Sequence, residues 1–209
     1  MRARMNAIQT PRLILISATA ESLSAELVSP QALGEILGCG VPASWPPELY
    51  DADAVRWTLT WLAEHPDQSG WSLYYIAEAP RTPTEQSRLV GVCGYKGGPD
   101  AAGEVEIGYG IVPERRRRGF ASEAVRGLLA RAFADARVKN VIAHTLSELA
   151  ASIGVLQATG FSFDGAGNDP QEPAAIRFVL TRDRYEQLIG GHGGARVPEL
   201  SRPPRPSVT

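Results

Sequence analysis

The segment from residue 104 to residue 136 constrains the fold of this chain most strongly, because a strand pattern, a charged turn and a helix pattern follow one another there. From Glu104 to Ile111, apolar side chains alternate with glutamates and glycines, the period of two that indicates a β-strand with one buried face. After Pro113 and a run of four arginines, apolar residues recur at helical spacing between Ala121 and Ala136. We therefore predict a strand, a turn containing glycine and a long helix.

The segments on either side also carry strand and helix patterns, and no internal repeat is visible. The strands at residues 72–78 and 89–95 are expected to pair antiparallel across the polar loop between them. Further strands are expected at residues 13–16, 141–145 and 175–180, and helices at residues 29–37, 51–64 and 151–159. This order of elements predicts a mixed α/β fold in which helices flank one mixed sheet.

The length and composition set the limits of that domain. With 209 residues, of which 44% are hydrophobic, the chain can form one sizeable core but not two large domains. We expect a single domain at residues 10–189, preceded by a flexible terminus at residues 1–9. Beyond Gly190, glycine and proline replace the large apolar side chains, so residues 190–209 are interpreted as a disordered tail.

Charge and cysteine content argue against several classes of function. The 21 basic and 23 acidic residues give a net charge of −2, so no overall positive field favours nucleic acid or a membrane surface. The longest uncharged run, residues 149–163, is shorter than the roughly 20 residues that cross a bilayer, and no secretory signal is evident, which favours a cytoplasmic location. Cys39 and Cys93 lack the spacing of a zinc or redox motif, so we interpret them as buried and expect no metal.

The turn between the strand and the long helix is the candidate anion site. The first turn of a helix has amide N–H groups without internal partners and a partial positive charge, and Gly119 lets the backbone approach a ligand closely. Arg116, Arg117 and Arg118 add guanidinium groups whose geometry matches pyrophosphate oxygens. These features predict a ligand that carries phosphate groups.

A run of arginines is also typical of a solvated loop or of a nucleic-acid patch, and Arg115–Arg118 could form such a patch. The run continues into a helix pattern at Ser122–Val125, whereas an RNA-recognition motif would continue into a strand. Neither a dinucleotide fingerprint nor a nucleoside-triphosphate loop follows any of the expected strands.

Three blocks of sequence between residues 89 and 163 together match one family pattern. The first is Arg116-x-x-Gly119-x-Ala121, between a strand and a helix, and the second is Glu106-Ile-Gly-Tyr109, just upstream. The third is Ser152-Ile-Gly-Val-Leu-Gln-Ala-Thr-Gly-Phe161, downstream. In order and spacing the blocks resemble the GNAT superfamily of acyl-CoA-dependent N-acyltransferases, and in particular its ribosomal-protein-acetyltransferase (RimJ/RimL-like) branch. Outside this region the resemblance is one of topology only.

The resemblance implies a GNAT-like fold with acetyl-CoA as the cofactor. The pyrophosphate would lie on the backbone and side chains of Arg116, Arg117, Arg118, Gly119, Phe120, Ala121 and Ser122. The pantetheine arm would run along Ile111 and Val112, in a slot opened where the strand bearing Glu106 splays from the strand at residues 141–145. Leu149 and Ser152 would complete this site.

The chain departs from its relatives at two of these positions. Many relatives carry asparagine three residues before the serine and arginine two residues after it, whereas this chain has Leu149 and Gly154. The departures remove polar contacts to the cofactor arm and leave open a second interpretation, a CoA-binding regulator without turnover.

Glu106 is the candidate general base, because an acceptor amine is mostly protonated near neutral pH and must lose a proton before it attacks a carbonyl. Glu104 is the alternative, and both glutamates are also compatible with a solvent-facing strand edge. The resemblance assigns Ser152 to the departing thiolate, although a hydroxyl at a helix N-terminus is often only a cap. Tyr109 is either core or a substitute for Ser152, and His144 is a further candidate for proton transfer.

The acceptor is expected to be a primary amine of a small molecule or of a protein N-terminus. Trp45, Tyr50, Trp57 and Trp61 lie where family members shape the acceptor site, and Trp45 and Trp57 are the predicted substrate-binding residues. Such aromatic residues could form an apolar or cation-receiving wall, or they could belong to the core. No nucleic-acid or membrane partner is expected, and the sequence is compatible with a monomer or a homodimer.

Overall fold

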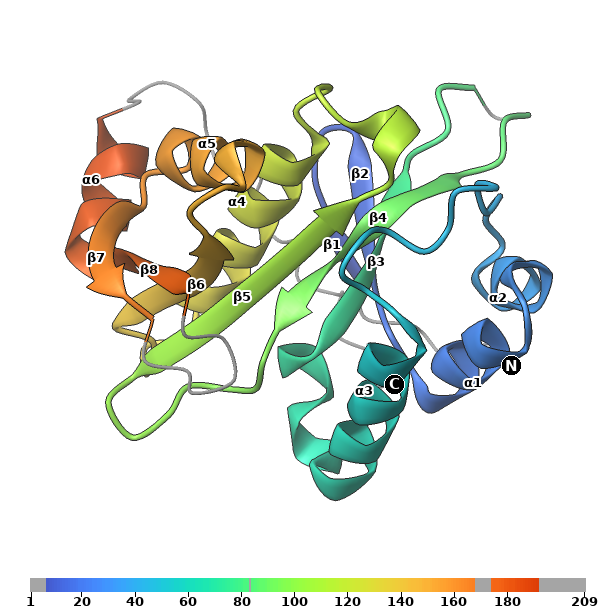
Figure 1. Ribbon diagram of the computed structural model, residues 1–209, viewed down its shortest axis with the longest axis horizontal. Helices are drawn as coiled ribbons and strands as arrows, with labels where there is room; N and C mark the ends of the chain where they lie inside the picture. Colours follow the sequence, from blue (N-terminus) through green and yellow to red (C-terminus); the bar gives the residue numbers. More distant parts are fainter. Residues whose placement is uncertain (1–6, 83, 168–173, 192–209) are drawn as a thin grey trace, which may run out of the picture.

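One mixed sheet organises the fold, and helices cover both of its faces (Figure 1). The computed structural model describes residues 7–82, 84–167 and 174–191. Its strands are β1 (Ala7–Gln9), β2 (Leu13–Ser17), β3 (Leu73–Glu78), β4 (Arg88–Tyr95), β5 (Glu104–Ile111), β6 (Asn140–Leu146), β7 (Ser162–Ala166) and β8 (Ala175–Thr181). Its helices are α1 (Ala20–Val28), α2 (Pro30–Leu37), α3 (Ala52–Glu64), α4 (Phe120–Phe133), α5 (Ala150–Ala158) and α6 (Arg182–Gly190), with short 3-10 helices at Pro66–Trp71 and Pro113–Arg115.

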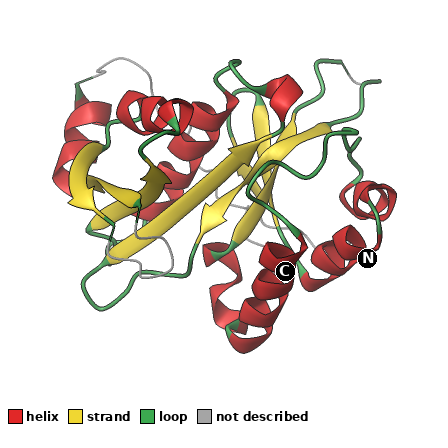
Figure 2. Ribbon diagram, in the orientation of Figure 1, coloured by secondary structure: helices red, strands yellow, loops and turns green. Residues whose placement is uncertain are grey.

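The sheet order is β1-β2-β3-β4-β5-β6-β8-β7, and only β5 and β6 are parallel neighbours. Their pairing covers just three positions, from Glu104 opposite Asn140 to Glu106 opposite Ile142. Beyond this point β5 continues along β4 and β6 continues along β8. The two strands therefore part after Glu106, as the sequence resemblance predicts, and the second half of β5 has a free edge on that side within the described residues (Figure 2).

Two clusters of buried side chains lie on opposite faces of the sheet. Along β3, Tyr74 and Ile76 belong to one cluster and Tyr75 and Ala77 belong to the other. Because successive side chains of a strand point to opposite faces, each cluster fills one side. The buried stripe of α4 packs into the first cluster, and α1, α2 and α3 cover the second (Figure 1).

The helices differ in how their first amide groups are satisfied. The side chains of Thr19, Ser29 and Asp51 accept hydrogen bonds from backbone N–H groups in the first turns of α1, α2 and α3, which is the usual N-cap arrangement. By contrast, α4 begins after Gly119 and α5 after Leu149 without a side-chain cap. The amide groups at these two helix ends are thus open to another acceptor.

The expected strands and helices are all present, with shifted ends. The long helix ends at Phe133 rather than at Ala136. The Arg182 guanidinium donates hydrogen bonds to the carbonyls of Phe133, Asp135 and Val138 and so holds the chain in a turn after the helix.

The structure also contains α1, β1, β7 and α6, which the sequence patterns did not indicate. Strand β1 lies inside the segment that was expected to be flexible, residues 1–9, and pairs antiparallel with β2. It therefore starts before the predicted domain limit at residue 10. Of the tail expected at residues 190–209, all but the first two residues lie outside the described ranges.

Cys39 and Cys93 are buried free thiols, which confirms their expected place in the core. Burial raises the pKa of the Cys39 thiol to about 11, so this group stays protonated near neutral pH. Among the residues that the structure describes, no cluster of three metal-ligating side chains occurs. No helix in these ranges is long and apolar enough to cross a membrane.

Candidate functional site

The turn before α4 presents backbone amide groups that no side chain caps. Gly119, the residue that precedes the helix, has a left-handed backbone with φ of 78°, and Arg117 is left-handed as well, with φ of 60°. For a residue with a side chain this conformation costs about 1 kcal/mol, a strain typical of functional sites. Left-handed residues within a turn direct successive N–H groups into one concavity, which suits an anion. The helix dipole adds a partial positive charge at the same place.

Two of the four arginines in the turn are held by the protein itself. Nη1 of Arg115 lies 3.1 Å from Oε2 of Glu78. Arg116 donates from Nε to the carbonyl of Ile111 at 3.0 Å, and its Nη2 lies 2.9 Å from Oε2 of Glu48. The Arg116 side chain thus folds back over the end of β5 and is paired within the chain, whereas the resemblance predicts that it contacts the pyrophosphate.

Arg117 and Arg118 remain exposed and have no carboxylate partner among the described residues. They are therefore the two guanidinium groups of the run that are available to an anionic ligand. Because Arg115 and Arg116 are neutralised, the run offers less positive charge to a nucleic acid than its sequence suggests.

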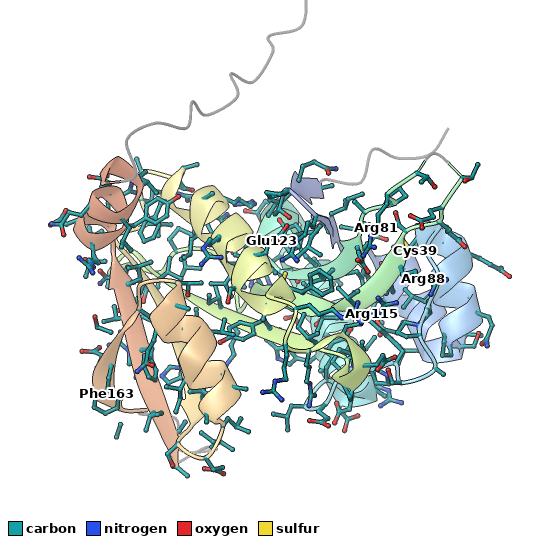
Figure 3. All side chains as sticks on the ribbon, turned by 90° about the horizontal axis from the view of Figure 1, so that it is seen from above. Cys39, Arg81, Arg88, Arg115, Glu123 and Phe163 are labelled. Carbon is teal, nitrogen blue, oxygen red and sulfur yellow. The ribbon has the colours of Figure 1, made fainter. Side chains whose placement is uncertain are left out.

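A clamp from the other end of the chain fixes the start of α4. Glu123 accepts hydrogen bonds from the Thr10 hydroxyl and from the Arg12 amide, both at 2.7 Å, and its Oε2 lies 2.7 Å from Nε of Arg12 (Figure 3). Nη1 of Arg12 donates to the carbonyl of Arg118 at 3.0 Å, and its guanidinium lies 4.9 Å from the centre of the Phe120 ring. Partial burial raises the pKa of Glu123, but the hydrogen bonds from Thr10 and Arg12 outweigh it and hold the pKa below its usual value.

Beside this clamp lies an open groove of about 620 Å³. It is lined by Gln9, Thr10, Pro11, Arg12, Gly119, Ser122, Glu123, Arg126 and Gly127. Sequence reasoning missed Arg12 and Arg126 as neighbours of the turn. Arg12 lies far from the turn in sequence and carries no local signal, whereas Arg126 is one turn beyond Ser122 on the same helix and could have been found by helical spacing.

The other residues predicted to bind the cofactor differ in how accessible their backbone and side-chain atoms are to a ligand. Ile111 and Val112 are buried, and the Val112 amide already donates to the carbonyl of Val90, so little of this pair is open to a ligand. Phe120 is buried in the first core cluster and contributes only its backbone to the turn. Three other predicted residues have partly exposed side chains near the first turns of α4 and α5, namely Ala121, Ser122 and Leu149.

A second cavity, of about 390 Å³, lies on the face of the sheet that α3 covers. Its walls come from α3, from residues 48–50 and from the glycines of β4 and β5, among them Gly94, Gly108 and Gly110. A Cβ atom at Gly108 would meet nothing within 4 Å, so the missing side chain keeps this part of the cavity open. The cavity therefore has room for a small organic group against a floor of backbone.

The two tryptophans predicted to bind substrate have different environments. Trp57 lines this cavity, is 55% exposed and stacks on Trp61, with ring centres 6.5 Å apart. Trp45 is buried in the second core cluster, and its Nε1 donates to Glu26 at 2.8 Å. Trp45 does not line the cavity and packs in this core cluster.

Glu26 is a partly buried carboxylate that fixes the loop next to the cavity. It accepts hydrogen bonds from Trp45 Nε1, from the Tyr50 hydroxyl at 2.9 Å and from the Tyr75 hydroxyl at 2.7 Å. Loss of solvent raises the pKa of Glu26, and the three hydrogen bonds lower it in part. The cluster joins α1 and β3 to residues 45–50, so it positions Leu49, which is 88% exposed at the cavity rim.

Glu106 occupies the last paired position before β5 and β6 part. Its Oε1 lies 2.5 Å from Nζ of Lys96 and 3.1 Å from Nδ1 of His144. Glu104 has a different neighbourhood, because its Oε2 lies 2.6 Å from Nη2 of Arg177. The guanidinium of Arg177 cannot accept a proton, whereas the neutral imidazole of His144 beside Glu106 can. Of the two glutamates, Glu106 has the surroundings of a proton-transfer group.

Tyr109 and Ser152 meet on the opposite side of β5. The Tyr109 hydroxyl donates to the carbonyl of Ser152 at 3.1 Å and lies 3.2 Å from its Oγ. Burial raises the pKa of Tyr109 to about 12, although the hydrogen bond with Ser152 lowers it in part. Ser152 thus bonds to Tyr109 and does not cap α5. This hydroxyl pair and Glu106 lie on the two faces of the strand that borders the split.

Comparison with family models gives one domain. The model described as an acetyltransferase (GNAT) domain matches residues 12–162, which include β5, the turn, α4 and α5. A search of curated proteins by sequence found no match.

Solved structures with the same fold include several acetyltransferases. An acetyltransferase from Agrobacterium tumefaciens str. C58 is 18% identical, with a TM-score of 0.59 over 87% of this chain and 98% of that one. The ribosomal L7/L12 alpha-N-protein acetyltransferase RimL in complex with coenzyme A is 14% identical, with a TM-score of 0.59 over 86% and 99% of the two chains. The microcin C7 self-immunity acetyltransferase MccE, in complex with acetyl-CoA and AMP, is 11% identical, with a TM-score of 0.55 over 82% and 93%. At these identities the similarity establishes the fold.

Proposed function

The chain belongs to the GNAT acetyltransferase family, and from this premise we propose that it transfers the acetyl group of acetyl-CoA to a primary amine, with Glu106 as the general base. The observation that carries this proposal is the position of Glu106 where β5 and β6 part, next to an imidazole and an amine.

The turn before α4 fits the diphosphate of the cosubstrate. The turn has uncapped amides and two left-handed residues, and Arg117 and Arg118 carry exposed guanidinium groups in the same turn. Such groups bind phosphate oxygens well. When bound, acetyl-CoA supplies the thioester that an amine can attack. Arg116 acts indirectly in this proposal, because its hydrogen bond to Ile111 and its ion pair with Glu48 hold the turn in shape.

Glu106 removes the proton from the acceptor ammonium. Its Oε1 is the atom that faces both Lys96 and His144, so a proton taken there can pass to the imidazole. General-base catalysis of this kind contributes roughly 10² to 10⁴ in rate. Glu104, held by Arg177, has a structural role.

The hydroxyl pair on the other face assists the leaving group. With its pKa raised to about 12, Tyr109 keeps its proton at neutral pH and can donate a hydrogen bond to a thiolate, either itself or through Ser152. This arrangement assigns the leaving-group role to two hydroxyls, of which the sequence resemblance indicates only Ser152.

The acceptor binds in the cavity between α3 and the glycines of β4 and β5. Trp57 and Leu49 form an exposed apolar rim, and Gly108 leaves the floor open. An amine that carries a small apolar or aromatic group would bury that group against Trp57.

Release of free CoA thiol, measured over a panel of amino acids, polyamines, aminoglycosides and peptides, tests the proposal. At least one amine should give release, and Glu106→Gln should reduce kcat roughly 10²-fold or more while the melting-temperature shift caused by acetyl-CoA stays unchanged. Glu104→Gln is the matched control and should retain most of kcat. Binding of acetyl-CoA without release from any amine would instead favour a regulator, and loss of kcat in Glu104→Gln alone would move the base to that residue.

A further inference from the structure

The chain is almost free of lysine. Of its 21 basic residues only two, Lys96 and Lys139, are lysines, and the others are arginines. A primary amine on a side chain is therefore a rare group here, and one of the two lies in the candidate site.

Lys96 follows β4 and takes part in the wall of the acceptor cavity, together with Trp57 and Gly108. Its side chain is 58% exposed, and its Nζ lies 2.5 Å from Oε1 of Glu106. The backbone holds it there, because the Lys96 amide donates to the Glu106 carbonyl at 3.0 Å.

An ion pair this exposed contributes only about 0–1 kcal/mol to stability, so folding alone gives little reason for an amine at this place. The Lys96 ammonium instead lies beside the carboxylate of Glu106, the proposed general base, where the ammonium group of an acceptor is expected to lie.

We propose that Lys96 is an acceptor of the enzyme's own reaction, so that the protein acetylates itself at Nζ of Lys96. The inference rests on the proposed function, because it uses the same base and the same acetyl donor. It adds a modification site and names its substrate, an alkyl amine within the chain.

The chemistry of the step balances. The Lys96 ammonium gives one proton to Glu106, and the resulting amine attacks the thioester carbonyl of acetyl-CoA. The amide C–N bond forms, the C–S bond breaks, and the nitrogen loses a second proton. Of these two protons, one goes to the departing thiolate to give CoA and the other goes to water.

Self-acetylation would change the site that performs it. The modified Lys96 has no positive charge, so the ion pair with Glu106 is lost, and the acetamide group extends into the acceptor cavity. We expect the acetylated enzyme to bind external amines more weakly, with the acceptor KM raised, while the turn before α4 still binds acetyl-CoA.

The experiment incubates the full chain with acetyl-CoA and follows the mass of the intact protein, and peptide mapping then locates the acetyl group. Lys139 is exposed, directly precedes β6 and forms no ion pair with Glu106, whose carboxylate contacts Lys96 and His144, so it reports the chemical background in the same molecule. Lys96 should react roughly tenfold faster than Lys139 or more, at a rate independent of protein concentration. Protein purified from expressing cells should already carry part of the modification at Lys96.

Variants separate catalysis from simple reactivity. Lys96→Arg keeps the charge but should stay unmodified at this position. Lys139→Arg should acetylate Lys96 at the same rate as the parent chain. Glu106→Gln should lower the rate of acetylation of Lys96 to that of Lys139. Equal rates at the two lysines, or an unchanged rate in Glu106→Gln, would overturn the inference.

The inference and the proposed function can fail separately. Release of CoA by added amines, with Lys96 unmodified, would overturn the self-acetylation alone. If acetyl-CoA caused no melting-temperature shift and no amine released CoA, the proposed function would fail as well.

Discussion

Replacing Gly119 by alanine tests the role of the turn before α4, and the chain offers a matched control. Gly119 and Gly38 both have a left-handed backbone, with φ of 78° and 66°. Gly38 ends α2, and a Cβ atom there would meet nothing within 4 Å. At Gly119 the added Cβ would lie 3.3 Å from Nη2 of Arg12, within the turn that is proposed to bind the diphosphate.

The structure sets the expected magnitudes. A left-handed alanine costs about 1–2 kcal/mol, so both Gly119→Ala and Gly38→Ala should lower the melting temperature by roughly 2–8 °C. A hydrogen bond to a charged group contributes about 1.5–3 kcal/mol, so displacing a single amide from the diphosphate should raise the Kd for acetyl-CoA by roughly tenfold or more. Only Gly119→Ala should show this second effect.

Thermal denaturation and calorimetric titration with acetyl-CoA measure the two effects separately. The reasoning is refuted if Gly119→Ala binds acetyl-CoA as tightly as the parent chain while its melting temperature falls as in Gly38→Ala. It is also refuted if both variants lose binding equally, because the loss would then follow from destabilisation and not from the turn.

Three further predictions concern the Glu26 cluster, the acceptor cavity and the clamp formed by Arg12 and Glu123. Glu26→Ala removes the acceptor of three largely buried donors, at about 1–3 kcal/mol each, and should lower the free energy of unfolding in urea by roughly 3 kcal/mol or more; a loss below about 1 kcal/mol would contradict the cluster's role. Gly108→Val should fold normally, since its Cβ lies in open space, but should raise the acceptor KM by roughly tenfold with acetyl-CoA binding unchanged. Arg12→Ala should be less stable than the parent at neutral pH. Because the folded-state pKa of Glu123 lies below 4.5, this difference should be present above pH 4.5 and shrink as the pH falls through the lower value, whereas a difference that grows on acidification would exclude the ion pair as its cause.

Local patterns in the sequence were sufficient for the centre of the fold. The alternation in β5 and the helical spacing in α4 each involve neighbours within a few residues, so they can be recognised without the rest of the chain. Gly119 between them indicates the turn, and the left-handed backbone found there agrees with it. Edge strand β1 is only three residues long and gives no such pattern.

Contacts between distant residues could not be predicted in this way. Arg12 lies between β1 and β2, and Glu123 lies in the first turn of α4, so only the packing of these strands against the helix brings the two partners together. Lys96 is similar, because the register of β4 on β5 determines that it faces Glu106.

Burial distinguishes Trp45 from Trp57, which the sequence alone could not. Trp45 and Trp57 are both tryptophans near the start of α3, but Glu26 accepts the indole N–H of Trp45 inside the second core cluster, and Trp57 lies on an exposed face. The partner of Trp45 lies on α1, a helix that the sequence patterns did not indicate.

The most direct test of the account compares acetyl-CoA with S-acetylpantetheine, which carries the thioester arm but no diphosphate, in a melting-temperature measurement. At about a hundred times its Kd, acetyl-CoA should stabilise the protein by roughly 2.7 kcal/mol, which corresponds to an increase of roughly 5–11 °C, and S-acetylpantetheine at the same concentration should give little or no increase. Equal shifts from both compounds, or no shift with millimolar acetyl-CoA, would contradict the claim that the turn before α4 binds the diphosphate.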